Sequence, residues 1–209
     1  MIYLIGGAPK TGKTTLVKIL SQKYHIPWVS VDTLQCVARA YIKKSEHNKK
    51  FPTTIQKGKS NDDKYNKYST KEIVDAYIKQ GKTSYDAIEM FALSEITDGN
   101  DFSIEGYQVT PELANKLIDK YGGDKIKALF LCKNDKKALI NNFTRSKTPN
   151  DWILAKTKNQ DIVFPKIADM ISIYSKYFQI EAGKYNFRLF DMDEDFVKQI
   201  DKAIGYLRK

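Results

Sequence analysis

The side chains best suited to chemistry lie in a short stretch close to the start of the chain. From Gly7 to Thr14 the sequence is Gly-Ala-Pro-Lys-Thr-Gly-Lys-Thr, which fits the phosphate-loop pattern G-x-x-x-x-G-K-[ST]. Glycines at both ends let successive backbone N–H groups point into one anion-sized hollow. Lys13 can reach the β- and γ-phosphates of a nucleotide, and the Thr14 hydroxyl can ligate Mg²⁺. The candidate nucleotide-binding residues are Gly7, Ala8, Pro9, Lys10, Thr11, Gly12, Lys13, Thr14 and Thr15.

The residues around this stretch have the pattern that a phosphate loop requires. Residues 1–5 are an apolar run typical of a strand, and Leu16, Ile19 and Leu20 recur at helical spacing after the loop. Strand, glycine loop and helix therefore follow in the required order. The alternative, a glycine turn at the end of a strand, explains the glycines but not the lysine–threonine pair at the loop exit.

Two carboxylates follow predicted strands and form a second group of candidates. Asp32 follows the strand predicted at residues 26–31, and Glu105 lies at the C-terminal end of the next strand. Because ligands of open α/β sheets bind beyond the carboxyl ends of the strands, both side chains are expected at the same edge as Lys13. Asp32 is the candidate general base for an attacking hydroxyl, with the N-cap of the following helix as its alternative role. Glu105 can hold Mg²⁺ through water or contact a phosphate acceptor; the alternative is a carboxylate buried against a lysine.

The arginines form a third group, because this lysine-rich chain of net charge +10 has only four of them. Arginine is the side chain suited to bidentate phosphate recognition. Arg39 lies seven residues after Asp32 on the same predicted helix face and can hold an anionic substrate group, although a surface salt bridge explains it as well. Arg145 ends a predicted helix and can close over a transferred phosphoryl group as a catalytic residue. Gln108, three residues after Glu105, is a further candidate for substrate binding.

The elements that must position these residues alternate along the chain. Amphipathic stretches that predict helices separate five apolar runs. This order is typical of an α/β fold with a parallel sheet, here one domain of residues 1–209. The five strands are predicted at residues 1–5, 26–31, 101–108, 126–132 and 185–191.

Two stretches interrupt the alternation. Residues 45–69 are polar and turn-rich, which predicts a mobile surface insertion, and residues 70–97 predict two helices. Together, residues 45–100 occupy the place expected for a substrate-binding insertion. Residues 133–160 are predicted to be a lid-like segment, because residues 146–160 are polar and rich in turn signals.

Composition restricts the compartment and the partners. The chain has no run close to the ~20 apolar residues of a membrane span, and it enters a predicted strand at once without a secretory signal. Cys36 and Cys132 lack metal-ligand spacing and lie among apolar residues, so we expect buried free thiols in a reducing compartment, by default the cytoplasm. The positive charge fits nucleic acid, an anionic substrate or a lysine-rich surface. Tyr65, Tyr68 and nearby lysines can stack on nucleic acid, with a solvated charged face as the alternative.

These motifs, taken in order, resemble those of the P-loop small-molecule kinases. That group includes nucleoside monophosphate kinases, shikimate kinase, and the 2-phosphoglycerate-kinase-like and zeta-toxin-like ATP-binding proteins. The resemblance rests on Gly7–Thr15, Asp32, the segment 105–108 and the arginine-bearing segment after the fourth strand, and it covers most of the chain. It implies a five-stranded parallel sheet of order 2-3-1-4-5 with helices on both faces, a helical insertion that binds substrate, and a lid with arginines.

Two details place the chain within this group. Residues 105–108, Glu-Gly-Tyr-Gln, stand where nucleoside monophosphate kinases have Asp-Gly-Phe-Pro-Arg. The missing proline and arginine count against a nucleoside monophosphate as acceptor. Residues 30–34, Ser-Val-Asp-Thr-Leu, are more similar to the 2-phosphoglycerate-kinase-like and zeta-toxin-like proteins, where such an aspartate is the base.

Three functions remain open at this point. The resemblance implies an ATP-dependent kinase that moves the γ-phosphoryl group of Mg-ATP to a hydroxyl or phosphate of a small, anionic acceptor. The basic charge and the tyrosine–lysine stretch favour a nucleic-acid end kinase as a first alternative. The small number of arginines favours a second alternative, a nucleotide-binding regulatory module without turnover.

Overall fold

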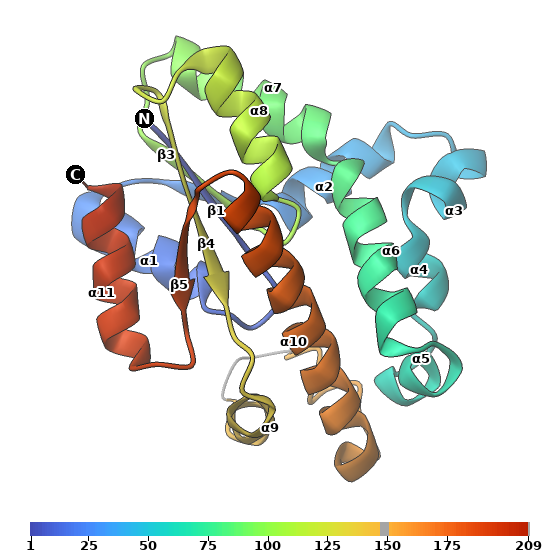
Figure 1. The fold of residues 1–209 in the computed structure, drawn as a ribbon. Coiled ribbons are helices and arrows are strands. Elements are labelled where there is room, and N and C mark those ends of the chain that lie inside the picture. The colour runs from blue at the N-terminus through green and yellow to red at the C-terminus, as the bar shows by residue number, and fades with distance from the viewer. Residues whose placement is uncertain (147–150, 209) are drawn as a thin grey trace.

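Five parallel strands form one sheet at the centre of the fold (Figure 1). The computed structural model describes residues 1–146 and 151–208. The strand order is β2-β3-β1-β4-β5, which confirms the order 2-3-1-4-5. The strands are β1 (Ile2–Gly7), β2 (Trp28–Ser30), β3 (Phe102–Gly106), β4 (Ile126–Cys132) and β5 (Arg188–Asp191).

The register of the sheet brings the carboxyl ends of three strands together. β1 pairs with β3, and Ile5 lies opposite Glu105. On the other side of β3, Ser30 of β2 lies opposite the same glutamate. Because β1 leads directly into the phosphate loop, the loop, Glu105 and the end of β2 share one edge of the sheet.

Helices cover both faces of the sheet, and each face has its own core. Alternate side chains of β1 point to opposite faces, so Leu4 lies in one core and Ile5 in the other. Coverage of both faces is typical of a parallel sheet and explains why the strands are largely apolar. Helices α1 (Lys13–Tyr24) and α11 (Phe196–Leu207) cover the Ile5 face. In the described part of the chain, no helix combines the length and the apolar character needed to cross a membrane.

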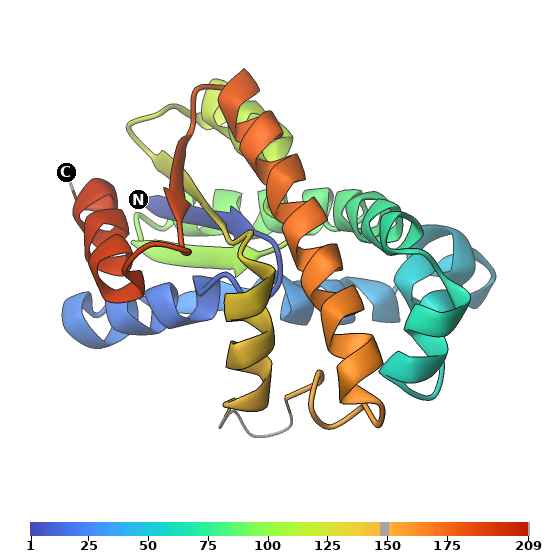
Figure 2. The same cartoon turned by 60° about the horizontal axis from the view of Figure 1, so that its bottom comes forward.

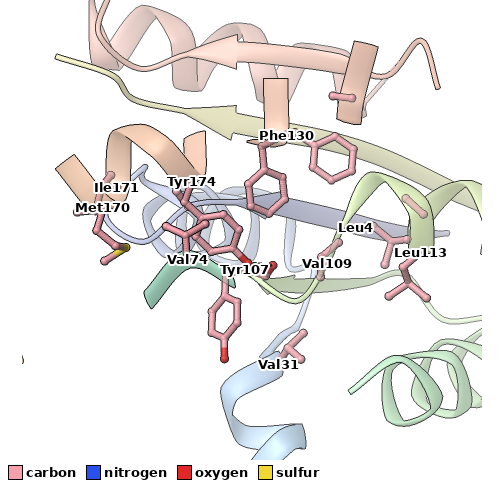
Figure 3. Close-up of a cluster of buried hydrophobic side chains, with 14 of the residues drawn as sticks. Leu4, Val31, Val74, Tyr107, Val109, Leu113, Phe130, Met170, Ile171 and Tyr174 are labelled. Atoms are coloured by element: carbon pink, nitrogen blue, oxygen red, sulfur yellow. Dashed lines mark hydrogen bonds between the residues drawn. The ribbon is translucent and has the colours of Figure 1, made fainter. Parts of the chain in front are cut away.

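The larger core lies on the Leu4 face of the sheet (Figure 3). Tyr107, just after β3, meets Tyr174 and Val74 in this core. The Tyr174 hydroxyl donates a 3.3 Å hydrogen bond to the backbone carbonyl of Tyr107, which fixes the chain beyond the end of β3. The helices that cover this face are α6 (Thr70–Lys82), α7 (Tyr85–Thr97), α8 (Pro111–Tyr121) and α10 (Gln160–Lys184).

Residues 45–69 are folded, where the sequence predicted a mobile surface stretch. Two of their aromatic side chains are buried, since Phe51 is 1% exposed and Tyr65 is 3% exposed, and Tyr68 is half-buried. Single aromatic residues among lysines and serines give no periodic signal. The helix of residues 61–67 lies beside the lower half of α10 in Figure 2, and the helix of residues 52–56 packs against α6, which itself packs against α10. The elements before α6 are α2 (Val31–Ala40), the 3₁₀ turn η1 (Lys44–Glu46), α3 (His47–Lys50), α4 (Pro52–Gln56) and α5 (Asn61–Lys67).

The predicted lid-like segment begins with α9 (Lys136–Thr144) and leads into turns before α10. Part of that segment, residues 147–150, lies outside the described residues. Beyond this gap, Asn61 of α5 donates a 3.0 Å hydrogen bond to the carbonyl of Trp152. The Asp62 carboxylate accepts 2.9 Å hydrogen bonds from the two backbone N–H groups that precede α10. These contacts attach the second half of the segment to the insertion.

Helix α2 presents apolar side chains to solvent. Val37 is 57% exposed, and Tyr41, the C-cap residue of this helix, is 87% exposed. Cys36 is exposed as well, so the prediction of a buried thiol is wrong there: its apolar neighbours lie on an open helix face. Cys132, at the end of β4, is buried as predicted, and burial raises the pKa of its thiol to about 12.

Candidate active site

The phosphate loop has a backbone shape that suits an anion. Gly7 and Gly12 have positive φ angles of 144° and 98°, which residues with a side chain rarely adopt. A Cβ atom at Gly7 would lie 2.3 Å from the Leu131 carbonyl oxygen, so the loop needs glycine for space as well. The Thr11 hydroxyl donates a 2.9 Å hydrogen bond to the Ala8 carbonyl and closes the loop on itself. The predicted order of strand, loop and helix is confirmed by β1 and α1.

Lys13 is held inside this loop. Its side chain is 8% exposed, and Nζ donates a 2.7 Å hydrogen bond to the Ala8 carbonyl. Burial lowers the pKa of Lys13, while the negative charges of Glu105 and Asp32 oppose this effect. The charges of Glu105 and Asp32 therefore lie close enough to Lys13 to act on its pKa.

Thr14 and Glu105 have the chemistry of a Mg²⁺ site. Thr14 Oγ1 donates a 3.1 Å hydrogen bond to Glu105 Oε1. Glu105 is 4% exposed, and burial raises its pKa, an effect that Lys13 and the Thr14 hydrogen bond oppose. Mg²⁺ prefers oxygen ligands and takes few of them from the protein when it binds nucleotide phosphates, so a hydroxyl beside a carboxylate fits this ion.

Asp32 lies in the first turn of α2 with an exposed side chain. The N-cap of α2 is Ser30, whose hydroxyl accepts a 3.3 Å hydrogen bond from the Asp32 backbone N–H. The alternative role of Asp32 as the cap is therefore wrong, and its carboxylate is left for other contacts. One such contact comes from Gln108, whose Nε2 donates a 2.8 Å hydrogen bond to Asp32 Oδ1. Gln108, expected to touch substrate, is fully buried and lies outside the lining of the cavity next to Asp32.

That cavity, of about 570 Å³, joins the charged groups of the site. Lys13, Thr14, Asp32 and Glu105 all line it. Its size suits a small molecule. Most of the remaining lining comes from six large uncharged side chains, which we call the acceptor subsite: Trp28, Gln35, Tyr77, Gln80, Tyr107 and Trp152.

None of these six residues was predicted from the sequence, although two had a usable signal. Gln35 lies one helical turn after Asp32, and Tyr107 lies two residues after Glu105. The others come from β2, from α6 and from the segment before α10. No spacing in the sequence connects these distant elements, because the fold alone brings them together.

A second cavity, of about 630 Å³, shares Lys10, Lys13 and Thr14 with the first. Phe196 of α11 lies against the phosphate loop here, because a Cβ atom at Gly12 would come within 2.7 Å of its ring. The phosphate loop therefore lines two cavities, and the two carboxylates belong to the first. The residues particular to the second cavity are Gly12, Thr15, Lys18, Lys133, Asn142 and Phe196.

Lys10 makes a contact that the sequence did not predict. Its backbone is in the left-handed region, with a φ of 63°, and Nζ forms a 2.7 Å ion pair with Asp151. The Asp151 side chain is 2% exposed and also accepts hydrogen bonds from the Ser146 hydroxyl and the Ile153 backbone N–H. This ion pair joins the phosphate loop to the lid-like segment.

Neither of the two candidate arginines lines a cavity beside the phosphate loop. Arg39 places its guanidinium 5.2 Å from the ring centroid of Phe51 and donates a 3.3 Å hydrogen bond to the Thr54 hydroxyl. The expected cleft shared by Asp32 and Arg39 is therefore not formed, because the arginine packs on the insertion. Arg145 is exposed at the C-terminal end of α9. Within the residues that the structure describes, no arginine lines either cavity.

Several solved structures share this fold, although no protein-family model and no curated protein matches the sequence. Shikimate kinase from Bacteroides thetaiotaomicron is 16% identical, with a TM-score of 0.54, and the match covers 100% of this chain and 99% of that one. A gluconokinase from Sinorhizobium meliloti 1021 is 9% identical, with a TM-score of 0.54 and coverage of 97% and 89%. A sugar kinase from Janibacter sp. HTCC2649 is 10% identical, with a TM-score of 0.52 and coverage of 99% and 94%.

The chain has the fold of the P-loop small-molecule kinases. The likeness to the shikimate kinase and to the gluconokinase covers 97% or more of this chain. At such low identity the likeness establishes the fold, so the reaction must be argued from the site.

Proposed function

We propose that this protein is an ATP-dependent kinase that transfers the γ-phosphoryl group of Mg-ATP to a hydroxyl group of a small molecule. The observation that carries this proposal is the position of the phosphate loop, which lines two cavities at once. A nucleotide and an acceptor can thus meet at Lys13 and Thr14. The carboxylates Asp32 and Glu105 line one cavity only, which makes that cavity the acceptor side.

Each group around the loop has one task in this proposal. Backbone N–H groups and Lys13 hold the β- and γ-phosphates. Thr14 and Glu105 hold Mg²⁺, which when bound neutralises the charge of these phosphates. Phe196 supplies an apolar wall for the nucleotide base in the second cavity. The approach of Arg145 to the transferred group stays a prediction from the sequence.

Asp32 is the general base of the proposed reaction. The proton of the acceptor hydroxyl passes to the Asp32 carboxylate as the hydroxyl oxygen bonds to the γ-phosphorus. The bond between the γ-phosphorus and the β–γ bridging oxygen breaks, and ADP leaves with that electron pair. Gln108 positions the carboxylate through its 2.8 Å hydrogen bond.

A nucleic-acid end kinase has less support. Tyr65, one of the two tyrosines that suggested stacking, is 3% exposed, and Lys64 beside it is 7% exposed. Stacking on bases requires accessible rings. A regulatory module without turnover differs from a kinase in its activity alone, so an activity measurement separates the two.

The test is ADP release from Mg-ATP with a panel of sugars, nucleosides, aminoglycosides, phosphoglycerates, nucleoside monophosphates and an oligonucleotide. Wild type is compared with Lys13→Met, with Asp32→Asn, and with the control Asp75→Asn, an exposed aspartate of α6 outside both cavities. We expect one acceptor class to raise ADP release, the first two variants to lose this effect, and the control to keep it. Retained ATP binding without release above background for any acceptor would favour the regulatory module.

A further inference from the structure

The acceptor subsite combines aromatic rings and amides without a charge of its own. Four of its six side chains are aromatic and two are glutamines. The carboxylates of Asp32 and Glu105 line the same cavity, and Asp32 lies one helical turn from Gln35. Among the described residues that line this cavity, the cations are Lys10 and Lys13, and both belong to the phosphate loop.

Both of these lysines already have partners. Lys13 Nζ donates to the Ala8 carbonyl over 2.7 Å and is the group that meets the nucleotide phosphates. Lys10 Nζ is paired at 2.7 Å with Asp151, whose side chain is 2% exposed. Withdrawal of Lys10 would leave a buried carboxylate without its cation, which is strongly unfavourable. Neither ammonium group is therefore free to bind an acidic group of the acceptor.

The polar groups of the subsite carry no charge, and those of Gln80 and Tyr107 are hydrogen-bonded to each other. Gln80 Nε2 donates to the Tyr107 hydroxyl over 3.2 Å, and Gln80 Oε1 accepts from the Thr53 hydroxyl over 2.6 Å. Burial, with a further contribution from the charge of Asp32, raises the pKa of Tyr77 to about 12. Burial raises the pKa of Tyr107 as well. The subsite therefore presents protonated hydroxyl groups and amides between aromatic faces.

We propose that the acceptor subsite selects an uncharged ring compound with several hydroxyl groups, a sugar or a nucleoside, and rejects acids and phosphate esters. This inference rests on the proposed kinase function. Aromatic side chains pack against the faces of such rings, while amides and hydroxyls exchange hydrogen bonds with the ring substituents. A carboxylate or phosphate in the same place would lose water without meeting a free cation among the described residues that line the cavity, and it would face Asp32. From the sequence, Arg39 was expected to hold an anionic group of the acceptor. In the structure Arg39 packs on Phe51 instead, so the inferred acceptor is uncharged.

Matched pairs of acceptors test this inference. In the first pair, uridine and orotidine differ by one carboxylate on the base and share every hydroxyl group. In the second pair, glucose and glucuronate, the carboxylate replaces one primary hydroxyl group. ADP release at a fixed concentration of Mg-ATP gives kcat/KM for each compound. We expect the neutral member to be the better acceptor by about tenfold or more. An acidic member that is equal or better would overturn the inference and leave the kinase function standing, whereas no release with any acceptor of the wider panel would overturn both.

A pair of variants tests whether charge is the cause of selection. Gln35→Lys places an ammonium group in the subsite, and Gln35→Met removes the amide at a similar length without adding charge. We expect Gln35→Lys to raise the ratio of kcat/KM for the acidic over the neutral member by about tenfold, and Gln35→Met to leave it within about threefold of wild type. Circular dichroism of both variants is used to check that they are folded. A ratio that Gln35→Lys leaves unchanged would overturn the inference.

Discussion

The side-chain amide of Gln108 donates a 2.8 Å hydrogen bond to Oδ1 of Asp32. Gln108 is fully buried after β3, whereas Asp32 is exposed on α2. A Cβ atom at Gly106 would come within 2.5 Å of Gln108 Oε1, so the amide has room only because residue 106 is a glycine. In the described structure Oε1 is buried without a hydrogen-bond partner, and the donor end of the amide is the end that faces the candidate base.

A second carboxylate at this position is expected to shift the pH profile of the reaction. In Gln108→Glu the new charge opposes ionisation of Asp32, so the acid limb of kcat/KM against pH moves upward by about one unit. The measurement is ADP release with the best acceptor across the pH range. Gln22→Glu, on an exposed position of α1, is the control and should leave the profile in place. An unmoved profile in Gln108→Glu would show that this contact is absent from the working enzyme.

The Thr14 hydroxyl is expected to set the requirement for Mg²⁺. Thr14→Val keeps the shape of the side chain but removes the oxygen that contacts Glu105 over 3.1 Å. We expect the Mg²⁺ concentration for half-maximal activity to rise by about tenfold or more in this variant, because one candidate ligand is lost. Thr14→Ser retains the hydroxyl and should behave like wild type. Equal Mg²⁺ dependence in all three proteins would remove Thr14 from the metal site.

Phe196 is expected to contribute to nucleotide affinity. Its ring lies against Gly12 and lines the second cavity. Phe196→Ala should weaken ATP binding by up to about tenfold in a calorimetric titration, since packing of an aromatic ring is worth roughly 0.5–1.5 kcal/mol beyond its buried area. Val197→Ala is the matched control, because Val197 is 69% exposed and outside the cavity. The same loss in both variants would argue against a base site at Phe196.

Lys64 is expected to make stability depend on pH. It is 7% exposed, and burial lowers the pKa of its ammonium group to about 8. The folded state thus disfavours the charged form of Lys64, and keeping this form buried lowers the free energy of unfolding. This loss of stability is complete below pH 8 and decreases as the pH rises toward 10.5, the ordinary pKa of lysine. Relative to Lys64→Met, wild type should gain on the order of 2 kcal/mol between about pH 7.5 and about pH 9.5.

Chemical denaturation at the two pH values measures this gain. The control is Lys79→Met, at an exposed lysine of the neighbouring helix α6. This variant keeps Lys64, so its stability should run parallel to that of wild type between the two pH values. A wild-type stability that runs parallel to that of Lys64→Met would mean that Lys64 is solvated in the folded protein.

The sheet and the phosphate loop could be predicted from the sequence because their signals are local. The loop needs Gly7 and Gly12 for its backbone and Lys13 for its charge, and these types stand at fixed spacing. β4 is apolar apart from Lys127, because both faces of the sheet are covered. Because the carboxyl ends of parallel strands meet at one edge of the sheet, Asp32 and Glu105 could be predicted to lie at the same edge.

The acceptor subsite and the packing of residues 45–69 could not be predicted, because their signals are not local. Trp28, Tyr77 and Trp152 come from elements far apart in the chain, and tertiary packing alone gathers them. Lys64 belongs to a side-chain type that is usually on the surface, yet it is buried over the ring of Tyr77. Arg39 had the right helical spacing to Asp32, but short helices that the sequence did not reveal pack against it.

Transfer of a labelled γ-phosphoryl group tests the central claim most directly. ATP with heavy oxygen in its γ-phosphoryl group is incubated with enzyme, Mg²⁺ and the best acceptor, and the products are analysed by mass spectrometry. We expect wild type to place the label in a phosphate ester of the acceptor, and Asp32→Asn to form little or none of this ester. Label that appears in inorganic phosphate alone, with wild type and variant alike, would contradict phosphoryl transfer to an acceptor at this site.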